Sequence, residues 1–268
     1  MDVTEICEMF GLGAPAGPFS YVARGELGRV SRLATSAGVW AIKEIDLFVP
    51  TVDEADANVQ LQELMLDARV VTLPRPRRTV DGHGLFGNVR VYEWLELSPV
   101  PVNDVETDEL VAASLARMHV HAPRTDERPD PWYSEAMNRH EWDLRLDEGA
   151  GTWWATIIAA FVAELVDLPR PEHLPAQICH LDVCPENVFL CNGRLAVLDW
   201  ENAGPAATVQ DLGSTLWDFC QGDPGRTRAF VDNYRRHGGP LERLEPWVFD
   251  TARVVQANLI DFHCRRAL

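Results

Sequence analysis

In the stretch from His180 to Asp199, the side chains of Asp182, Asn187 and Asp199 carry oxygen atoms that can bind a metal ion or take up the proton of a hydroxyl group. The Asn187 amide and the Asp199 carboxylate are ligands of the kind that Mg2+ prefers, together with the phosphate groups of a substrate. Asp182 precedes Asn187, and its carboxylate can act as a general base. The stretch therefore predicts acid–base chemistry beside a divalent cation.

Two short apolar runs, 188–191 and 195–198, predict a hairpin that brings the two metal-type ligands together. The pair Asn192-Gly193 between them is typical of a tight type I′ turn. With this turn, Asn187 falls opposite the residue that precedes Asp199. Cross-strand neighbours lie about 5 Å apart and diagonal neighbours about 7–8 Å apart, so the amide oxygen and the carboxylate can share one or two cations.

The spacing His-x-Asp-x4-Asn, from His180 to Asn187, is that of the catalytic loop of kinases. In such a loop the aspartate accepts the proton of the substrate hydroxyl group and the asparagine binds metal. A polar loop before an ordinary hairpin would explain the same residues without catalysis. An Asn-Gly hairpin that ends in Leu198-Asp199 makes the combination much rarer, and it favours the catalytic interpretation.

With these residues the sequence resembles the aminoglycoside phosphotransferase group of the protein-kinase-like fold, which also includes choline, homoserine and related small-molecule kinases. The resemblance covers most of the chain and implies an α+β, bilobal protein-kinase-like fold with an antiparallel-sheet N-lobe and a mainly helical C-lobe. Further segments are similar to motifs of that group: Leu115–His119, Leu198–Glu201, Ala203-Gly204, Asp211–Gly213, and Tyr234 with Gly238-Gly239.

The resemblance implies a Mg2+-dependent kinase that uses ATP, with GTP as the alternative donor. Asp182 would deprotonate the acceptor hydroxyl group, while Asn187 and Asp199 would hold Mg2+ across the phosphates. A catalytically silent nucleotide-binding protein is a rival hypothesis. The retention of Asp182, Asn187 and Asp199 together with Lys43 speaks against it.

Two segments depart from the pattern of the group. Leu181 stands where a glycine is usual, and Gly204-Pro205-Ala206 stands where Gly-Asp-Pro is common. Neither change removes a catalytic side chain. We expect the first to alter the loop backbone and the second to reshape the floor of the acceptor site.

Lys43 is the only lysine in a chain with 23 arginines. The runs 30–35 and 39–45 predict a hairpin, and the second run resembles the kinase strand whose lysine grips the α- and β-phosphates. An ammonium group on a flexible stem suits a phosphate, and arginine does not replace it interchangeably. We therefore expect Lys43 to bind nucleotide and support catalysis, although a surface lysine at a strand end is the alternative.

Further nucleotide contacts are expected around this hairpin. Gly25 and Gly28 lie in the preceding turn, where the resemblance places a loop over the phosphates, although two glycines are also common in any turn. Residues 53–70 are expected to form an amphipathic helix. By resemblance, Glu63 of that helix would pair with the lysine, with Glu54 as the rival partner.

Residues 89–95 are expected to form the last strand of the N-lobe and the hinge after it. The resemblance implies that the backbone of Glu93 and of Leu95 hydrogen-bonds the adenine. Closely spaced prolines follow and stop both helix and sheet. We expect a nucleotide-binding lobe at residues 1–96 and a catalytic and substrate-binding lobe at residues 97–268.

Helices are expected in the remaining segments. A short one is capped by Thr4 and runs to about Phe10, and three longer ones cover 110–119, 153–165 and 251–263. The polar insertion from Pro123 to Asp147 receives no assigned structure.

The acidity of the chain bears on its partners. A net charge of -17 argues against nucleic acid or an anionic membrane, because both bind clustered lysine and arginine. Residues 1–96 hold 14 acidic and 9 basic residues, and residues 97–268 hold 27 and 15, so the second part carries a net charge of -12. A cationic small molecule is the expected substrate, although solubility alone would explain the charge equally well.

An aminoglycoside-like antibiotic is the leading hypothesis for the acceptor, which would make the protein an antibiotic-resistance enzyme. A metabolic kinase for choline, a sugar or homoserine is the alternative. The residues expected nearest the acceptor are Glu201, Asp218, Asp143, Trp132 and Trp142.

The cell compartment is expected to be the cytoplasm. No apolar run approaches the ~18–20 residues of a membrane span, and the first residues are acidic where a signal peptide would be basic. The six cysteines lack the spacing of zinc ligands and are expected to be reduced.

Overall fold

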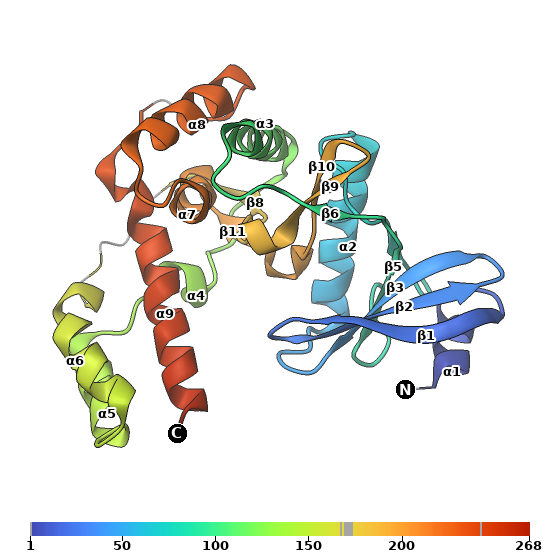
Figure 1. Ribbon diagram of the computed structural model, residues 1–268, viewed down its shortest axis with the longest axis horizontal. Helices are drawn as coiled ribbons and strands as arrows, with labels where there is room; N and C mark the ends of the chain where they lie inside the picture. The colour runs from blue at the N-terminus through green and yellow to red at the C-terminus, as the bar shows by residue number, and fades with distance from the viewer. Residues whose placement is uncertain (1, 167, 169–173, 242) are drawn as a thin grey trace. The chain divides into compact units, whose positions relative to one another are not determined.

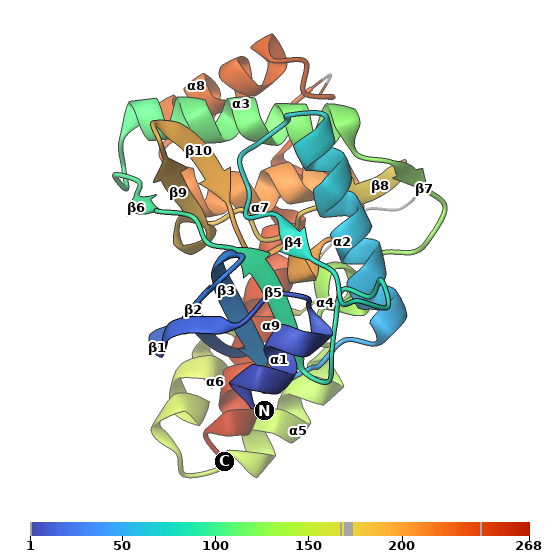
Figure 2. The same cartoon turned by 90° about the vertical axis from the view of Figure 1, so that its right-hand side faces the viewer.

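The structure, a computed structural model, describes residues 2–166, 168, 174–241 and 243–268. The chain divides into two compact units. The first holds the residues up to Val100 together with Glu186–Glu201, and the second holds Pro101–Pro185 together with Asn202–Leu268. Figures 1 and 2 label the helices and strands of both units.

An antiparallel five-stranded sheet forms the body of the first unit, in the order β1-β2-β3-β5-β4. The expected strands at 30–35 and 39–45 and the expected helix at 53–70 are confirmed, whereas β1 lies where no element was expected. The elements are α1 (Val3–Met9), β1 (Pro15–Arg24), β2 (Gly28–Thr35), β3 (Gly38–Ile45), α2 (Val52–Asp67), β4 (Pro76–Arg77) and β5 (Val89–Glu93).

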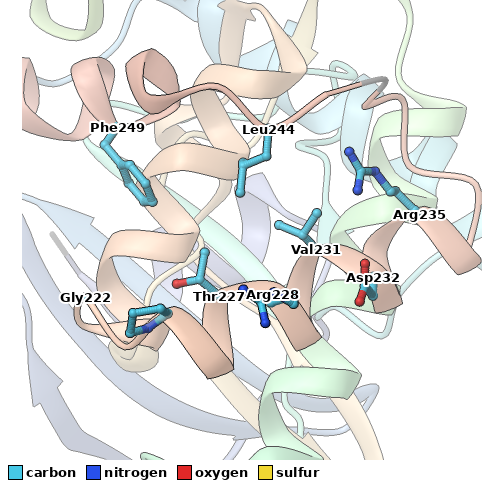
Figure 3. A pocket seen from close by; sticks show the side chains of 9 residues that line it. Gly222, Thr227, Arg228, Val231, Asp232, Arg235, Leu244 and Phe249 are labelled. Atoms are coloured by element: carbon cyan, nitrogen blue, oxygen red, sulfur yellow. The ribbon is translucent and has the colours of Figure 1, made fainter.

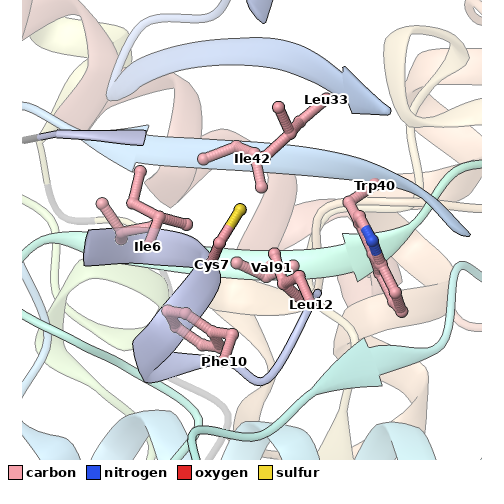
Figure 4. Packing of buried hydrophobic residues seen from close by; sticks show 9 residues of the cluster. Ile6, Cys7, Phe10, Leu12, Leu33, Trp40, Ile42 and Val91 are labelled. Atoms are coloured by element: carbon pink, nitrogen blue, oxygen red, sulfur yellow. The ribbon is translucent and has the colours of Figure 1, made fainter. Parts of the chain in front are cut away.

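The N-terminal helix begins earlier than the sequence analysis expects. Asp2, and not Thr4, caps α1, because the Asp2 carboxylate accepts a hydrogen bond from the Thr4 N–H at 3.3 Å. A buried apolar cluster holds this helix on the sheet, as Figure 4 shows for Ile6 against Ile42 of β3. Side chains alternate between the two faces of a strand. Because Ile42 points toward α1, Lys43 points to the opposite face.

The predicted hairpin and its register are confirmed. Val188 pairs with Val197, and the N–H of Leu198 donates to the Asn187 carbonyl oxygen at 2.9 Å. The residues of the Asn192-Gly193 turn have φ values of 51° and 74°, and a type I′ turn requires positive φ at both positions. The hairpin belongs to a small sheet in the order β10-β9-β6, formed by β6 (Ser98–Pro99), β9 (Val188–Cys191) and β10 (Arg194–Val197).

The division into units differs from the expected lobes 1–96 and 97–268, because Glu186–Glu201 groups with the first unit. Two contacts explain this. Strand β9 pairs with β6, and the Val197 N–H donates to the Thr72 carbonyl oxygen at 2.9 Å. The hairpin with the metal-type ligands therefore lies on the same unit as Lys43.

The second unit is mainly helical, as expected. The predicted helices at 110–119, 153–165 and 251–263 correspond to α3, α6 and α9, and the insertion 123–147 forms β7, α4 and most of α5. The helices are α3 (Val105–His121), α4 (Pro131–Ser134), α5 (Arg139–Glu148), α6 (Trp153–Leu165), α7 (Thr208–Cys220), α8 (Pro224–Arg236) and α9 (Asp250–Arg266). A three-stranded sheet holds β7 (Arg124–Thr125), β8 (Ala176–Cys179) and β11 (Gly204–Ala206), and short 3-10 turns lie at η1 (Pro185–Asn187), η2 (Trp200–Asn202) and η3 (Pro246–Phe249).

Helix α7 packs tightly against η3 at Gly213. A Cβ atom at this position would lie 1.8 Å from the Val248 carbonyl oxygen, which explains a glycine in the middle of a helix. The close approach fixes α7, which carries Asp211 near its first turn. None of the helices in the described part of the chain is long and apolar enough to cross a membrane.

Candidate active site

The Lys43 ammonium group lies between two carboxylates of the first unit. Lys43 Nζ is 2.7 Å from Asp199 Oδ1 and 3.0 Å from Glu201 Oε2. Burial would lower the pKa of Lys43, but Glu201 and Asp199 outweigh it and raise the pKa above its ordinary value. The lysine is therefore held as a cation on the sheet face opposite α1.

Glu201 is mostly buried and is itself fixed by two groups of β5. The Tyr92 hydroxyl group donates to Glu201 Oε1 at 2.9 Å, and Arg90 Nη1 lies 3.4 Å from the same oxygen. Arg90 is 1% exposed, and its Nη2 donates to the Ala55 carbonyl oxygen of α2 at 3.2 Å. These contacts make Glu201 the link between the lysine and the body of the sheet.

The two carboxylates differ in how firmly they stay ionised. Burial would raise the pKa of Glu201, but Lys43, Asp199 and Arg90 together hold that pKa well below its ordinary value. Burial and the neighbouring Glu201 raise the pKa of Asp199 to about 7, against the opposing effect of Lys43. Asp199 is therefore the less firmly ionised carboxylate of the pair.

The predicted pairing of Glu63 with Lys43 is wrong. Glu63 is bound instead to Arg78, with distances of 3.0 Å from Nε to Oε1 and 2.7 Å from Nη2 to Oε2. The reason lies in the orientation of α2, which buries Gln62 and leaves the next residue at its edge. The rival, Glu54, caps α2, because its carboxylate accepts the Thr51 N–H at 2.7 Å.

Glu201 contacts side chains of the first unit in this structure, and its expected contact with the acceptor stays a prediction. Its carboxylate is occupied by Lys43, Arg90 and Tyr92, all within the first unit. Glu201 therefore supplies the partner for the lysine that the sequence analysis sought on the helix.

A buried carboxylate in the second unit holds the backbone that precedes Asp182. Asp211 Oδ1 accepts the Leu181 N–H at 3.0 Å, and Asp211 Oδ2 accepts the His180 N–H at 3.3 Å. The Asp182 N–H in turn donates to His180 Nδ1 at 3.2 Å. Because a carboxylate that accepts backbone N–H groups fixes their directions, Asp211 determines the course of the loop into Asp182.

Asp211 is oriented by a histidine and a tyrosine from two other helices. His119 Nε2 lies 3.0 Å from Asp211 Oδ2, and His119 Nδ1 lies 2.7 Å from the Tyr234 hydroxyl oxygen. Cys179 lies close enough that the group resembles a metal site. Both ring nitrogens of His119 already have partners, and burial followed by the charge of Asp211 raises the pKa of the Cys179 thiol well above its ordinary value. The cluster is therefore suited to holding the loop rather than a metal ion.

The Asp182 carboxylate has a partner that the sequence analysis missed. Asn202 Nδ2 donates to Asp182 Oδ2 at 3.1 Å. Asn202 is the last residue of η2 and directly follows the Asp199–Glu201 segment. That segment resembles a motif of the family, but Asn202 lies just outside the motif. This hydrogen bond orients the carboxylate of Asp182.

Leu181 takes the backbone conformation that glycine usually supplies. Its φ is 66°, in the left-handed region, and its side chain packs against Cys179 and Ala206. The two hydrogen bonds to Asp211 hold this left-handed conformation, which a leucine disfavours.

This conflict predicts an unusual order of stability. Leu181→Ala keeps the left-handed backbone and loses packing, at a cost of about 2–5 kcal/mol. Leu181→Gly loses the same packing but removes a backbone penalty of about 1–2 kcal/mol. We expect the glycine variant to be at least as stable as the alanine variant in urea unfolding.

The matched control is Leu212 of α7, which is equally buried but helical. There glycine should be about 1 kcal/mol less stable than alanine, the usual order in a helix. The same order at both positions would contradict the proposed conflict at Leu181.

The sequence of the chain matches a known family of enzymes. The sequence profile of the phosphotransferase enzyme family APH matches residues 20–247 of the chain. The protein belongs to this family. It is accordingly a small-molecule kinase, which transfers phosphate to a hydroxyl group, as the spacing around Asp182 predicts.

Solved structures of kinases share the fold of the phosphotransferase. The amicoumacin kinase hAmiN in complex with AMP-PNP, Ca2+ and Ami is 14% identical, with a TM-score of 0.65 over 100% of this chain and 87% of that one. The spectinomycin phosphotransferase APH(9)-Ia with ADP and spectinomycin is 12% identical, with a TM-score of 0.66 over 99% and 86%. The choline kinase LicA from Streptococcus pneumoniae is 15% identical, with a TM-score of 0.65 over 99% and 89%. The expected α+β, protein-kinase-like fold is confirmed, while no curated protein sequence matches the chain.

Two of the expected acceptor residues in the insertion of the phosphotransferase lie on α5. Trp142 is 0% exposed and belongs to the apolar core between α5, α6 and α9, so its predicted contact with the acceptor is wrong. Its side chain fills the centre of this packing. Asp143 is exposed on α5 and pairs with Arg139 at 3.0 Å.

The two remaining candidates are placed differently. Trp132 of α4 is partly buried with its ring against Phe262, at a centroid distance of 6.3 Å, and its helix is anchored by Asn258 Nδ2 at 2.8 Å from the Trp132 carbonyl oxygen. Tyr133, the next residue, packs against Leu181 beside the loop. Asp218 lies seven residues after Asp211 on α7, about 10 Å farther along the helix. Of these two segments, α4 contacts the catalytic loop, through Tyr133 and Leu181.

A pocket of about 410 Å³ lies beside α8 in the second unit (Figure 3). Arg228 and Arg235 line it together with Asp232, over an apolar floor that includes Leu244 and Phe249. Among the described residues that line it, none belongs to the predicted catalytic loop. Two arginines do not suit a cationic acceptor, so this pocket is not assigned to the reaction.

Proposed function

We propose that the phosphotransferase transfers the γ-phosphate of ATP, bound with Mg2+, to a hydroxyl group of a small cationic natural product, with an aminoglycoside-like antibiotic as the leading class. The observation that carries the proposal is the Lys43 ammonium group held between Asp199 and Glu201 at 2.7 and 3.0 Å. Such a lysine beside a metal-type carboxylate is what a triphosphate with a divalent cation requires.

The donor set fits Mg2+. Asn187 precedes the first strand of the hairpin and Asp199 follows the second by two residues, so both lie at its open end, and both offer oxygen ligands. Burial and then the neighbouring Glu201 raise the pKa of Asp199, and a divalent cation bound there would favour its ionised form. In this proposal Asn187 and Asp199 hold Mg2+, and the ion supplies charge neutralisation on the phosphates.

The nucleotide contacts of the first unit are assigned to three segments. Lys43 grips the α- and β-phosphates, and the turn Gly25–Gly28, closed by the Gly25 N–H on the Gly28 carbonyl oxygen at 2.9 Å, covers them. A Cβ atom at Gly28 would lie 2.1 Å from the Glu44 carbonyl oxygen, so this position requires glycine for packing as well. The Glu93 N–H already donates to the Arg75 backbone carbonyl oxygen. The Glu93 carbonyl group and the Leu95 N–H are therefore assigned to hydrogen bonds with the adenine.

Asp182 is assigned as the general base toward the acceptor hydroxyl group. Asp211 holds the backbone of the Asp182 loop by accepting the Leu181 N–H. The Asn202 amide orients the Asp182 carboxylate, with 3.1 Å from Nδ2 to Asp182 Oδ2. Phosphoryl transfer depends mostly on position and charge neutralisation, so a fixed carboxylate suffices as the protein's contribution to the hydroxyl group.

The acidity of residues 97–268 supports a cationic acceptor, because acidic surfaces concentrate cations. The solved structures that share the fold include kinases of antibiotics and also choline kinase and an ethanolamine kinase. A metabolic kinase of an amino alcohol is therefore the second candidate. A coupled phosphorylation screen with aminoglycosides, cationic peptide antibiotics, macrolides and amino alcohols separates the two.

The charge argument predicts a salt dependence. We expect kcat/KM for the best acceptor to fall on the order of tenfold between about 0.01 and 0.15 M salt, where the screening length drops from about 30 to about 8 Å. The measurement is the initial rate at limiting acceptor and saturating ATP, with KM for ATP followed as the control. A best acceptor that is neutral, or a cationic one whose capture ignores salt, would leave the acidity explained by solubility.

A further inference from the structure

Helix α6 presents a row of large apolar side chains to solvent. Trp153, Ile157 and Phe161 are 77%, 48% and 51% exposed. They are spaced four residues apart, so they form one stripe along the helix. A stripe of this kind on a helix surface marks an interaction site more often than a chance exposure of single residues.

The opposite side of α6 is already packed. Trp154, Ile158 and Val162 lie in the apolar clusters that join α6 to α9, and Figure 1 shows the two helices side by side. The stripe therefore points away from α9. Helix α9 also anchors α4, which packs beside Leu181 of the catalytic loop. The stripe, on the side of α6 away from α9, is therefore separate from these contacts with the loop.

The distribution of charge along the chain indicates which partner can bind the stripe on α6. From Gly149 to Ala163 the sequence carries no charged side chain, although the whole chain has a net charge of -17. Two copies of so acidic a chain repel each other wherever their charged surfaces meet. The uncharged stripe is a surface on which a second copy can approach, and the exposed residues Ala159 and Ala160 allow two helices to come close.

We propose that two copies of the chain associate through α6, packed antiparallel on its counterpart about a two-fold axis near Ile157. In this arrangement Trp153 of one copy meets Phe161 of the other, because the two positions lie about 12 Å apart along the helix and exchange under the rotation. The three large side chains offer roughly 400 Å² of apolar surface per copy. This is about half of a standard interface, so the dimer is weak, with a dissociation constant in the micromolar range.

Sedimentation velocity over a concentration series of the full chain tests the proposal. We expect a shift from monomer to dimer as the concentration rises through the micromolar range. Added salt should strengthen the association, because it screens repulsion between the acidic copies and leaves the apolar contact intact. A single monomeric species at all concentrations overturns the proposal, and so does a dimer that salt dissociates.

Two variants locate the contact. Ile157→Glu places like charges together at the axis and should weaken association on the order of tenfold or more. The matched control is Trp217→Glu, at an exposed tryptophan of α7, which should leave association unchanged. Thermal unfolding of both variants shows whether the fold is kept, since both positions are on the surface.

A covalent test does not depend on the affinity. Under mild oxidation, Ile157→Cys should form a disulfide-linked dimer across the axis, in which two thiols lose two protons and two electrons to an added oxidant such as copper phenanthroline. Trp217→Cys should stay monomeric under the same oxidation. Equal crosslinking of both variants, or a dimer that Ile157→Glu does not weaken, overturns the proposed contact.

Discussion

Asp182→Asn is expected to lower kcat on the order of 100-fold or more while the fold and the affinity for ATP stay unchanged, because a positioned general base contributes that much. The substitution keeps the shape of the side chain, and the new amide oxygen can still accept the hydrogen bond from Asn202. The measurement combines steady-state kinetics with the best acceptor, calorimetry with ATP, and thermal unfolding.

The matched control is Asp143→Asn, which removes one carboxylate from an exposed ion pair on α5 in the same unit. It should leave kcat unchanged. Asn202→Ala should fall between the two, because the carboxylate remains but loses its orientation. Wild-type turnover in Asp182→Asn would remove this residue from the mechanism.

Glu201→Gln is expected to lower kcat/KM for ATP by roughly 10- to 100-fold, since a hydrogen bond to a charged group contributes about 1.5–3 kcal/mol. The neutral amide no longer holds the Lys43 ammonium group, whose distance from Glu201 Oε2 is 3.0 Å in the structure. Glu201→Asp should recover part of the activity, because it restores the charge.

Glu63→Gln is the matched control for this prediction. Its carboxylate pairs with Arg78, a partly exposed group, and such pairs contribute about 0–1 kcal/mol. Tyr92→Phe removes only the hydroxyl group that orients Glu201, and it should give a smaller loss with the fold intact. Inactivity of Glu63→Gln beside an active Glu201→Gln would mean that the helix glutamate holds the lysine in the working enzyme.

Local features of the chain could be predicted because they depend on near neighbours. The register of the hairpin follows from Asn192-Gly193 alone, since positive φ at both positions selects the turn and the turn selects the pairing. The strand of Lys43 follows from its short apolar run and its motif.

The partners of polar side chains could not be predicted in the same way. Gln62 and Glu63 are adjacent polar residues, and the apolar pattern of α2 does not say which one faces inward; Arg78, fifteen residues later, captures Glu63. Trp142 is buried by α6 and α9, which follow it in the chain. The strand β1 was missed because Pro15 and Pro18 oppose a strand assignment, yet prolines are tolerated on an edge strand.

The bonds that fix Asp182 also join distant segments. Asp211 was noted only as part of a family pattern, although its two backbone hydrogen bonds and its contact with His119 set the loop. Asn202 had no signal of its own. Both depend on tertiary packing that no local pattern encodes.

The most direct test of the central claim is the transfer of label from γ-labelled ATP to an acceptor, followed by mass spectrometry of the product. The wild-type enzyme with Mg2+ should place the phosphate on a hydroxyl group of a cationic acceptor, with no label transferred in EDTA or by Asp182→Asn. Label on an amino group or on the protein itself, or equal transfer by Asp182→Asn, would contradict the assignment of Asp182 as the base for a small-molecule hydroxyl group.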